Sequence, residues 1–98
     1  MRFEIVLTRT AQNHYRVLSA RWRAVMKTEL ERHLRYEPTT TSRSRIKRLR
    51  AMAHPEYRLR VDEYRIFYDV VEAKVIVLAI VPKVGAGEWL DEHGVKSS

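Results

Sequence analysis

The sequence predicts an α+β fold in which helices pack on one face of a mainly antiparallel sheet. Three observations predict it. Residues 10–36 contain no Gly or Pro and carry apolar residues at helical spacing, whereas residues 57–70 alternate apolar and polar residues as strands do. VIVLAIV, residues 75–81, is a continuous apolar run of strand length. A chain of 98 residues can bury one small core, so we expect a single domain over residues 1–98.

The N-terminal part predicts one strand followed by a helical region. RFEIVLT, residues 2–8, has alternating apolar residues and an apolar centre, which indicates a short strand inside the sheet. The helical spacing of residues 10–36 fits either one long helix or two helices in a hairpin. Ser19 can cap a second helix, which favours the hairpin, and Pro38 ends the helical region.

The remainder predicts a polar linker, a three-stranded antiparallel meander and a short C-terminal helix. In the last of these, Trp89 and Leu90 are expected to face inward and Gly94 to end the helix. IKRLRAMAHPE, before the meander, predicts a loop or a short helix. The segments in order are the linker 39–45, the loop or helix 46–56, strands 57–61, 64–70 and 74–82, and the helix 86–94.

Charge and residue types restrict the functional classes. The chain has 19 Lys and Arg against 12 Asp and Glu, a formal net charge of +7, which favours nucleic acid, an acidic protein or an anionic membrane surface as partner. It has no cysteine, so disulfides, thiolate ligands and a thiol nucleophile are excluded. Its four histidines lie far apart without metal-ligand spacing, so we predict no metal and no cofactor.

The apolar segments do not indicate export or a membrane span. The first ten residues have charges on both sides of their apolar run and no small-residue cleavage site, unlike a secretory signal. Residues 75–81 are too few to cross a bilayer as a helix. We therefore predict a cytoplasmic protein without a membrane partner.

Basic residues alternate with apolar residues in YRLRVDEYRIFYDV, residues 57–70, where two strands meet at Asp62 and Glu63. A two-residue turn, or one widened by a residue on each side, places Arg60 opposite Arg65 and gathers the apolar residues on the other face. A slip by one residue would mix the two sets. Asp-Glu lacks the glycine that tight two-residue turns prefer, so the wider loop is at least as favourable.

Three arginines, Arg58, Arg60 and Arg65, therefore share one face with Phe67. Like charges directly across a strand pair destabilise a sheet by roughly 0.2–1 kcal/mol, so folding alone does not explain them. One interpretation is a solvated face on which nearby carboxylates neutralise the arginines. We favour a nucleic-acid site, because guanidinium groups bind phosphate through paired hydrogen bonds and an aromatic ring among them can stack on a base.

A basic run leads directly into this hairpin and supports the same interpretation. No acidic residue lies between Pro38 and Pro55. Positive charge next to the arginines would attract a phosphate backbone over a wider surface. The further nucleic-acid contacts that we predict, besides Phe67, are Arg43, Arg45, Lys47, Arg48 and Arg50.

KRLRAMAHPEYRLRVDEYRIFYDVVEAKVIVLAIVPK, residues 47–83, resembles the RelE/ParE superfamily of bacterial type II toxins, and the order of elements fits over most of the chain. The resemblance implies a RelE-like fold and a cognate acidic antitoxin as partner. RelE-like members cut messenger RNA in the ribosomal A site without a metal, whereas ParE-like members inhibit DNA gyrase. The expected function is that of a ribosome-dependent mRNA endoribonuclease that inhibits translation; the alternatives are a gyrase inhibitor and an inactive homologue.

The resemblance also assigns candidate catalytic residues. Arg58 and Arg60 match the paired basic residues before the hairpin turn, and Arg65 matches the arginine after it. Lys83 stands near the position of a further basic residue after the last strand. RelE-like enzymes usually have a tyrosine or histidine near the C-terminus, and this chain has His93 there; His54 is a second candidate for proton transfer, which arginine performs poorly.

Overall fold

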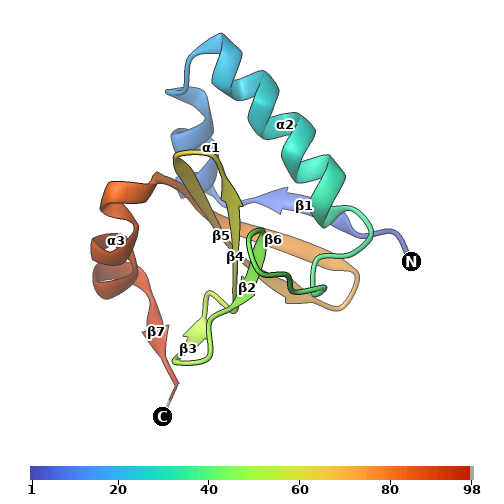
Figure 1. Cartoon of the computed structure of the whole chain (residues 1–98), viewed down its shortest axis with the longest axis vertical. Helices are drawn as coiled ribbons and strands as arrows, with labels where there is room; N and C mark the ends of the chain where they lie inside the picture. The colour runs from blue at the N-terminus through green and yellow to red at the C-terminus, as the bar shows by residue number, and fades with distance from the viewer. Residues whose placement is uncertain (98) are drawn as a thin grey trace.

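The computed structural model of the chain describes residues 1–97 and has an α+β architecture (Figure 1). None of the helices within residues 1–97 is long and apolar enough to cross a membrane. The elements are β1 (Glu4–Leu7), α1 (Arg9–Arg16), α2 (Ala20–Leu34), β2 (Ile46–Arg48), β3 (Met52–His54), β4 (Tyr57–Val61), β5 (Tyr64–Val71), β6 (Lys74–Pro82), the 3₁₀ turn η1 (Lys83–Gly85), α3 (Ala86–His93) and β7 (Val95–Lys96). The predicted strands and helices occur in the predicted order, and the short strands β2, β3 and β7 are additional.

The main sheet has five strands in the order β1-β6-β5-β4-β2. The pairs within the predicted meander, β4 with β5 and β5 with β6, are antiparallel, as is the pair of β2 with β4. Only β1 runs parallel to its neighbour, β6. The sheet is therefore mainly antiparallel. Strand β2, which is part of the basic run of the sequence, forms one edge of it.

The helical region forms two helices, which confirms the predicted hairpin. The side chain of Ser19 accepts a hydrogen bond from the backbone N–H of Trp22 at 3.2 Å, as the N-cap of α2. Thr8 caps α1 in the same way through the N–H of Ala11. Each helix therefore starts at a side chain that satisfies one of its free backbone donors.

The main hydrophobic core lies between α1 and α2 and one face of the sheet (Figure 1). Met26 and Leu34 of α2 and Leu59 and Ile66 of the sheet are fully buried there. The Tyr68 hydroxyl donates a hydrogen bond of 2.6 Å to the carbonyl of Pro38, which fixes the end of the helical region against the sheet. Burial raises the pKa of this hydroxyl, so Tyr68 acts as a neutral donor.

The C-terminal helix packs on the opposite face of the sheet, so the expectation that all helices share one face is wrong. Its residues Trp89 and Leu90 face inward as predicted and cover a second cluster of Phe67, Ala79 and Val81. These three residues alternate with core residues along β5 and β6, and they would be exposed without α3. Helix α3 covers this part of the second face.

Two short strands replace the loop or short helix expected for residues 46–56. Ile46 of β2 is 4% exposed and lies opposite Leu59 of β4, so burial and pairing with a distant segment determine its conformation. Strand β3 pairs with β7, an element after α3 that the sequence did not predict. Local sequence patterns do not contain these long-range pairings.

The β4–β5 hairpin has the narrower of the two turns considered. Val61 pairs directly with Tyr64, which leaves Asp62 and Glu63 as a two-residue turn. Asp62 has a φ of 49°, a left-handed conformation that Asp tolerates better than most residues other than glycine. The absence of glycine therefore does not prevent the tight turn.

Candidate nucleic-acid interface

The hairpin register confirms that the three arginines share one face. Arg60 pairs with Arg65, and Arg58 pairs with Phe67, as the alternation of apolar residues predicts. The opposite face of the same strands carries Leu59 and Ile66, which are fully buried under the helices. Apolar burial on one side of the hairpin therefore holds the arginines on the other side.

Strand β2 and the residue just before it add two further basic residues to this face. Lys47 lies directly opposite Arg58, and the backbone N–H of Arg60 donates to the carbonyl of Arg45 at 2.9 Å. Like charges therefore meet across both neighbouring strand pairs, which costs stability. We call this surface the basic face; its residues are Arg45, Lys47, Arg58, Arg60 and Arg65.

The basic face has no internal counter-charge among the residues that the structure describes. Every ion pair within residues 1–97 involves side chains outside it. The Nε of Arg58 is buried and has no hydrogen-bond partner within the same range. Burial, and then the charges of Arg65 and Arg60, lower the pKa of the Arg58 guanidinium below its usual value. An anion bound here would relieve both conditions.

These contacts disfavour the alternative of a face neutralised by its own carboxylates. Asp69, which lies on the same face of β5 as Arg65, accepts hydrogen bonds from the backbone N–H of Glu56 and from His54 instead. Asp62 and Glu63, in the turn, form no ion pair in the described chain. The arginines are therefore available to an external anion.

Arg65 is largely buried and makes structural contacts at the hairpin turn. It is 8% exposed, and its Nη1 donates to the backbone carbonyls of Asp62 and Tyr64 at 2.9 and 3.0 Å. These bonds fasten the hairpin turn. The other guanidinium nitrogens of Arg65 are not among the buried atoms without a partner, so they remain able to contact a ligand.

The predicted role of Phe67 as an exposed base-stacking residue is wrong. Its side chain is 1% exposed, and its ring stacks on Trp89 of α3 with centroids 5.4 Å apart and planes at 12°. Helix α3 covers the ring, so a base has no access to it. Phe67 instead holds α3 against the sheet.

The remaining predicted nucleic-acid contacts fall into two groups. Arg48 points away from the basic face: its guanidinium lies over the Tyr57 ring and its Nη1 donates to the carbonyls of Leu49 and Glu56. These contacts make Arg48 a structural residue. Arg43 and Arg50 are exposed in the flanking loops, where they extend the positive charge without belonging to the basic face.

The structure separates the last two candidate catalytic residues. Lys83 is exposed beside the hairpin turn, because its backbone N–H donates to the carbonyl of Glu63 at 2.7 Å. His93 instead packs on Trp89 and lines a hollow of about 260 Å³ together with Thr8, Thr10 and Leu78. No residue of the basic face lines that hollow, so the geometry does not support a joint role for His93 and the arginines.

Sequence reasoning did not find the pairing of His54 with Asp69. His54 Nδ1 lies 2.9 Å from Asp69 Oδ2, and the two residues are 15 positions apart on different strands. The available signal was the parity of β5, which places Asp69 on the same face as Arg65 and Phe67. Parity alone did not show that a histidine from the segment before the hairpin would contact it.

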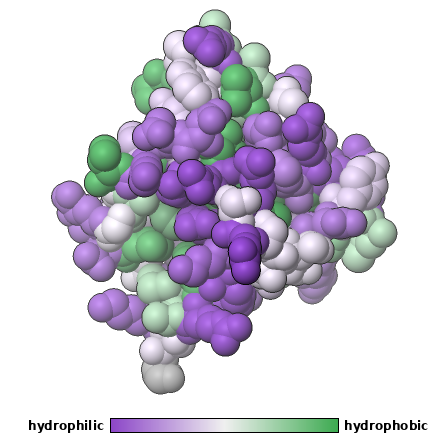
Figure 2. All heavy atoms as spheres, in the orientation of Figure 1, coloured by the Kyte–Doolittle hydropathy of each residue, from purple (hydrophilic) through white to green (hydrophobic). Residues whose placement is uncertain are grey.

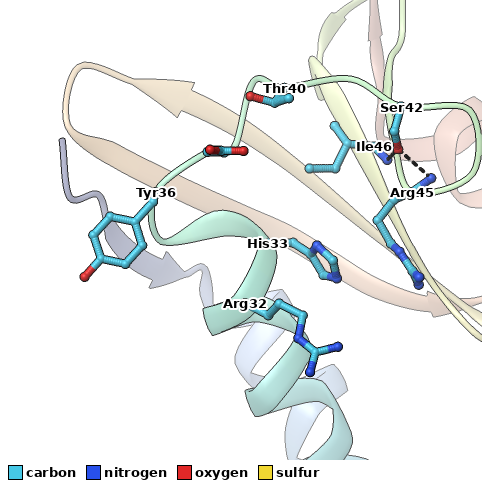
Figure 3. Close-up of a pocket in the computed structure, with 8 residues that line it drawn as sticks. Arg32, His33, Tyr36, Thr40, Ser42, Arg45 and Ile46 are labelled. Carbon is cyan, nitrogen blue, oxygen red and sulfur yellow. Dashed lines mark hydrogen bonds between the residues drawn. The ribbon is translucent and has the colours of Figure 1, made fainter.

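Positive charge continues from the basic face around the β2 edge. Arg45 lines a polar hollow of about 260 Å³ with Ser44, Arg60 and Asp62. It also lines a larger hollow of about 510 Å³ between the end of α2 and residues 40–46, together with Arg32 and His33 of α2 (Figure 3). The Ser42 hydroxyl shapes this loop by accepting hydrogen bonds from two backbone N–H groups, those of residues 45 and 46.

The surface composition agrees with a polar ligand. The side of the molecule seen in Figure 2 is mainly hydrophilic, and its apolar residues lie in small separate areas. No group of three or more metal-ligating side chains occurs within residues 1–97. The basic face is our candidate for ligand recognition, because its five cations form no ion pair within residues 1–97.

Comparison with known proteins identifies the fold. No family model and no curated protein matches the sequence. Among solved structures, the chain is similar to a chain in the toxin–antitoxin complex RelBE2 from Mycobacterium tuberculosis, with a TM-score of 0.67 and 22% sequence identity. The similarity covers 84% of this chain and 99% of that chain. The predicted RelE-like α+β fold is thereby confirmed.

Proposed function

We propose that this chain is the toxin of a type II toxin–antitoxin system and cleaves messenger RNA on the ribosome, which inhibits translation. The RelE-like fold and the resemblance of residues 47–83 support the toxin class. The observation that carries the proposal is the basic face, where Arg58, Arg60 and Arg65 lie on one side of the hairpin without an ion pair among residues 1–97.

The proposed chemistry follows from what arginines supply. In metal-independent RNA cleavage, a 2′-hydroxyl attacks the adjacent phosphate and negative charge accumulates on the phosphorus oxygens. Guanidinium groups fixed on two strands stabilise that charge without having to rearrange. Arg58 and Arg60 are the primary phosphate contacts, Arg65 supports the turn and the phosphate together, and Lys83 is an additional cation at the turn.

The proposed partner is an acidic antitoxin. A net charge of +7 attracts a negatively charged protein, and the neighbour of similar fold was solved as a toxin–antitoxin complex. The neighbouring reading frame tests this part. A short acidic protein encoded beside this chain, which binds it and restores growth, is the expected result.

A gyrase inhibitor of the ParE-like type is the second candidate, and one observation favours it. RelE-like enzymes usually have a tyrosine or histidine near the C-terminus. This chain has no tyrosine after Tyr68, and its histidine there, His93, lines a hollow that no residue of the basic face lines. A binding protein without chemistry would not need that residue. Transcript cleavage with ribosomes present, against gyrase inhibition or DNA breaks, separates the two candidates.

The decisive experiment is expression of the chain without its antitoxin, followed by mapping of transcript ends. We expect growth arrest with cleavage inside translated frames, and loss of both in Arg58→Ala and Arg65→Ala. Arg58→Ala is the cleaner variant, because Arg65 also fastens the turn. Arg21→Ala, an exposed arginine of α2 on the other side of the sheet, is the matched control and should remain toxic. Unchanged toxicity of a folded Arg58→Ala variant would refute the proposal.

A further inference from the structure

We propose that His54, held by Asp69, is the general base that removes the 2′-hydroxyl proton in this reaction. The inference rests on the proposed RNA cleavage and adds to it the group that the arginines cannot provide. Arginine keeps its proton at neutral pH, whereas imidazole is the side chain that most readily exchanges one there.

The pair combines an accessible base with a buried carboxylate. The side chain of His54 is 58% exposed, and that of Asp69 is 11% exposed. Asp69 is fixed from two sides, since Oδ1 accepts the backbone N–H of Glu56 at 2.8 Å and Oδ2 lies 2.9 Å from His54 Nδ1. The carboxylate therefore has a set position, and the imidazole ring is oriented by it.

This contact selects the tautomer that a base requires. An ionised carboxylate only accepts hydrogen bonds, so Nδ1 of a neutral His54 must carry the proton and donate it to Asp69. Nε2 then has a free lone pair. A carboxylate that orients a histidine in this way also stabilises the imidazolium that forms when Nε2 takes a proton.

His54 lies at the end of the basic face nearest Arg58. Asp69 is two residues from Phe67 along β5 on the same face, and Phe67 lies directly opposite Arg58. Two residues along a strand correspond to about 7 Å. When Arg58 binds a phosphate, the ribose attached to that phosphate can therefore lie close to His54. Arg60 and Arg65, at the other end of the basic face, would contact the neighbouring phosphates of the RNA.

The step balances without a co-reactant. The 2′-oxygen forms a bond to phosphorus as its proton moves to His54 Nε2, and the bond from phosphorus to the 5′-oxygen of the next nucleotide breaks. The leaving oxygen takes a proton from water, and His54 returns its proton to solvent. The products are a 2′,3′-cyclic phosphate and a 5′-hydroxyl end.

The other histidines are less suited to this role. His14 Nδ1 accepts a hydrogen bond of 3.1 Å from the backbone N–H of Ile80, so this side chain connects α1 to β6. His33 is bound to Glu29 on the surface of α2, and His93 lines the hollow with Thr8 and Thr10. Only His54 joins a buried carboxylate on the face that carries the arginines.

The test measures single-turnover cleavage of a messenger RNA on purified ribosomes as a function of pH, together with binding of the RNA to each variant. The variants are His54→Ala, Asp69→Asn and Arg58→Ala, with Arg21→Ala as control. Asp69→Asn is informative because its amide oxygen can still accept the Glu56 N–H, while its NH₂ group would donate to Nδ1 and place the proton on Nε2.

We expect His54→Ala to cleave about 100-fold more slowly with unchanged RNA binding, and added imidazole to restore part of the rate. We expect the cleavage rate of the unaltered chain to rise with pH and the cleavage rate of Asp69→Asn not to do so. If His54→Ala cleaves normally while Arg58→Ala is inactive, the inference fails and the proposed function stands. If His54→Ala cleaves slowly and imidazole does not restore the rate, or if this variant also loses RNA binding, His54 has a structural role and the inference fails. If the unaltered chain leaves RNA intact on ribosomes, both fail.

Discussion

Arg58 is the residue at which the conflict between stability and binding is clearest. Its Nε is buried without a partner, and it faces Lys47 on one side and the charges of Arg60 and Arg65 on the other. A buried donor without a partner costs about 1–3 kcal/mol, and a like-charge pair adds roughly 0.2–1 kcal/mol. Such a position is expected where a ligand supplies the missing contacts.

Replacement of Arg58 by methionine should therefore stabilise the fold while it removes binding. Methionine keeps the length of the side chain and has no donor to leave unpaired, so the free energy of unfolding should rise by about 1 kcal/mol. Denaturant unfolding measures this change, and an RNA-binding assay measures the loss. Arg21→Met should change the unfolding free energy by less than about 0.5 kcal/mol. A clear decrease in the stability of Arg58→Met would show that Arg58 has stabilising contacts in the free protein.

His14 should make stability depend on pH near neutrality. Its Nδ1 accepts a hydrogen bond from Ile80, and burial, followed by the charge of His93, lowers its pKa below the usual value. The unfolded chain therefore binds a proton before the folded chain does. The stabilisation is present above the unfolded pKa, about 6.5, and is lost as the pH falls below it towards the folded pKa.

His14→Asn keeps an acceptor for Ile80 but does not titrate. The free energy of unfolding of the unaltered chain should fall more than that of His14→Asn between about pH 7.5 and about pH 5. Chemical unfolding at both pH values measures the difference, in which the carboxylates common to both chains cancel. Parallel pH curves for the two chains would contradict the expectation.

At the scale of elements, α3 is held by two different contacts. Trp89 and Leu90 cover the cluster around Phe67, and β7 then pairs with β3 directly after the helix. Gly94 connects α3 and β7 at a point where a Cβ atom would lie 2.6 Å from the Leu90 carbonyl oxygen, and even closer to Met52 Cε. Glycine is needed there for space, because its backbone angles suit any residue.

Gly94→Ala should therefore loosen the connection between α3 and β7. The Leu90 oxygen is backbone and cannot move aside, so we expect a loss of about 1–3 kcal/mol in the free energy of unfolding. Gly87→Ala is the matched control in the same helix: a Cβ there meets nothing within 4 Å, and the change should stabilise α3 by up to about 1 kcal/mol. Thermal unfolding distinguishes the two, and equal effects would refute the steric argument.

At the scale of the whole molecule, the surplus of charge is organised by the fold. Residues from the linker, β2, β4 and β5 meet on the basic face, and Arg45 extends it towards the hollow at the end of α2 (Figure 3). A net charge of +7 would favour any polyanion. A continuous path of cations favours an extended phosphate backbone over a single anion.

RNA binding should weaken strongly as the salt concentration rises, and the residues of the basic face should be responsible for this effect. Each phosphate contact on single-stranded RNA contributes about 0.7 to the slope of log affinity against log salt concentration. Arg45→Ala and Lys47→Ala should each lower that slope by about this amount, whereas Arg21→Ala should leave it unchanged. Fluorescence anisotropy over a salt series measures it. Equal slopes for the three variants would show that binding is not localised on this face.

Local periodicity was enough to predict the helices and the hairpin register. The helical spacing and the cap at Ser19 gave two helices, and the alternation in residues 57–70 gave the register that sets Arg60 against Arg65. This register is required to bury the apolar side chains of both strands on one face, whichever residues form the turn. The predicted positions of Arg58, Arg60 and Arg65 followed from the same alternation.

Packing and long-range pairing, which local patterns do not contain, set which surfaces are covered and which distant residues are in contact. Phe67 has the same parity as the arginines, yet α3 buries it. Residues 46–48 and 52–54 form strands because β4 and β7 pair with them, and Asp69 contacts a histidine from β3. Parity specifies a face of a sheet but not what packs on that face. These contacts join residues far apart in sequence, and their free energy depends on burial that exists only once the chain has folded.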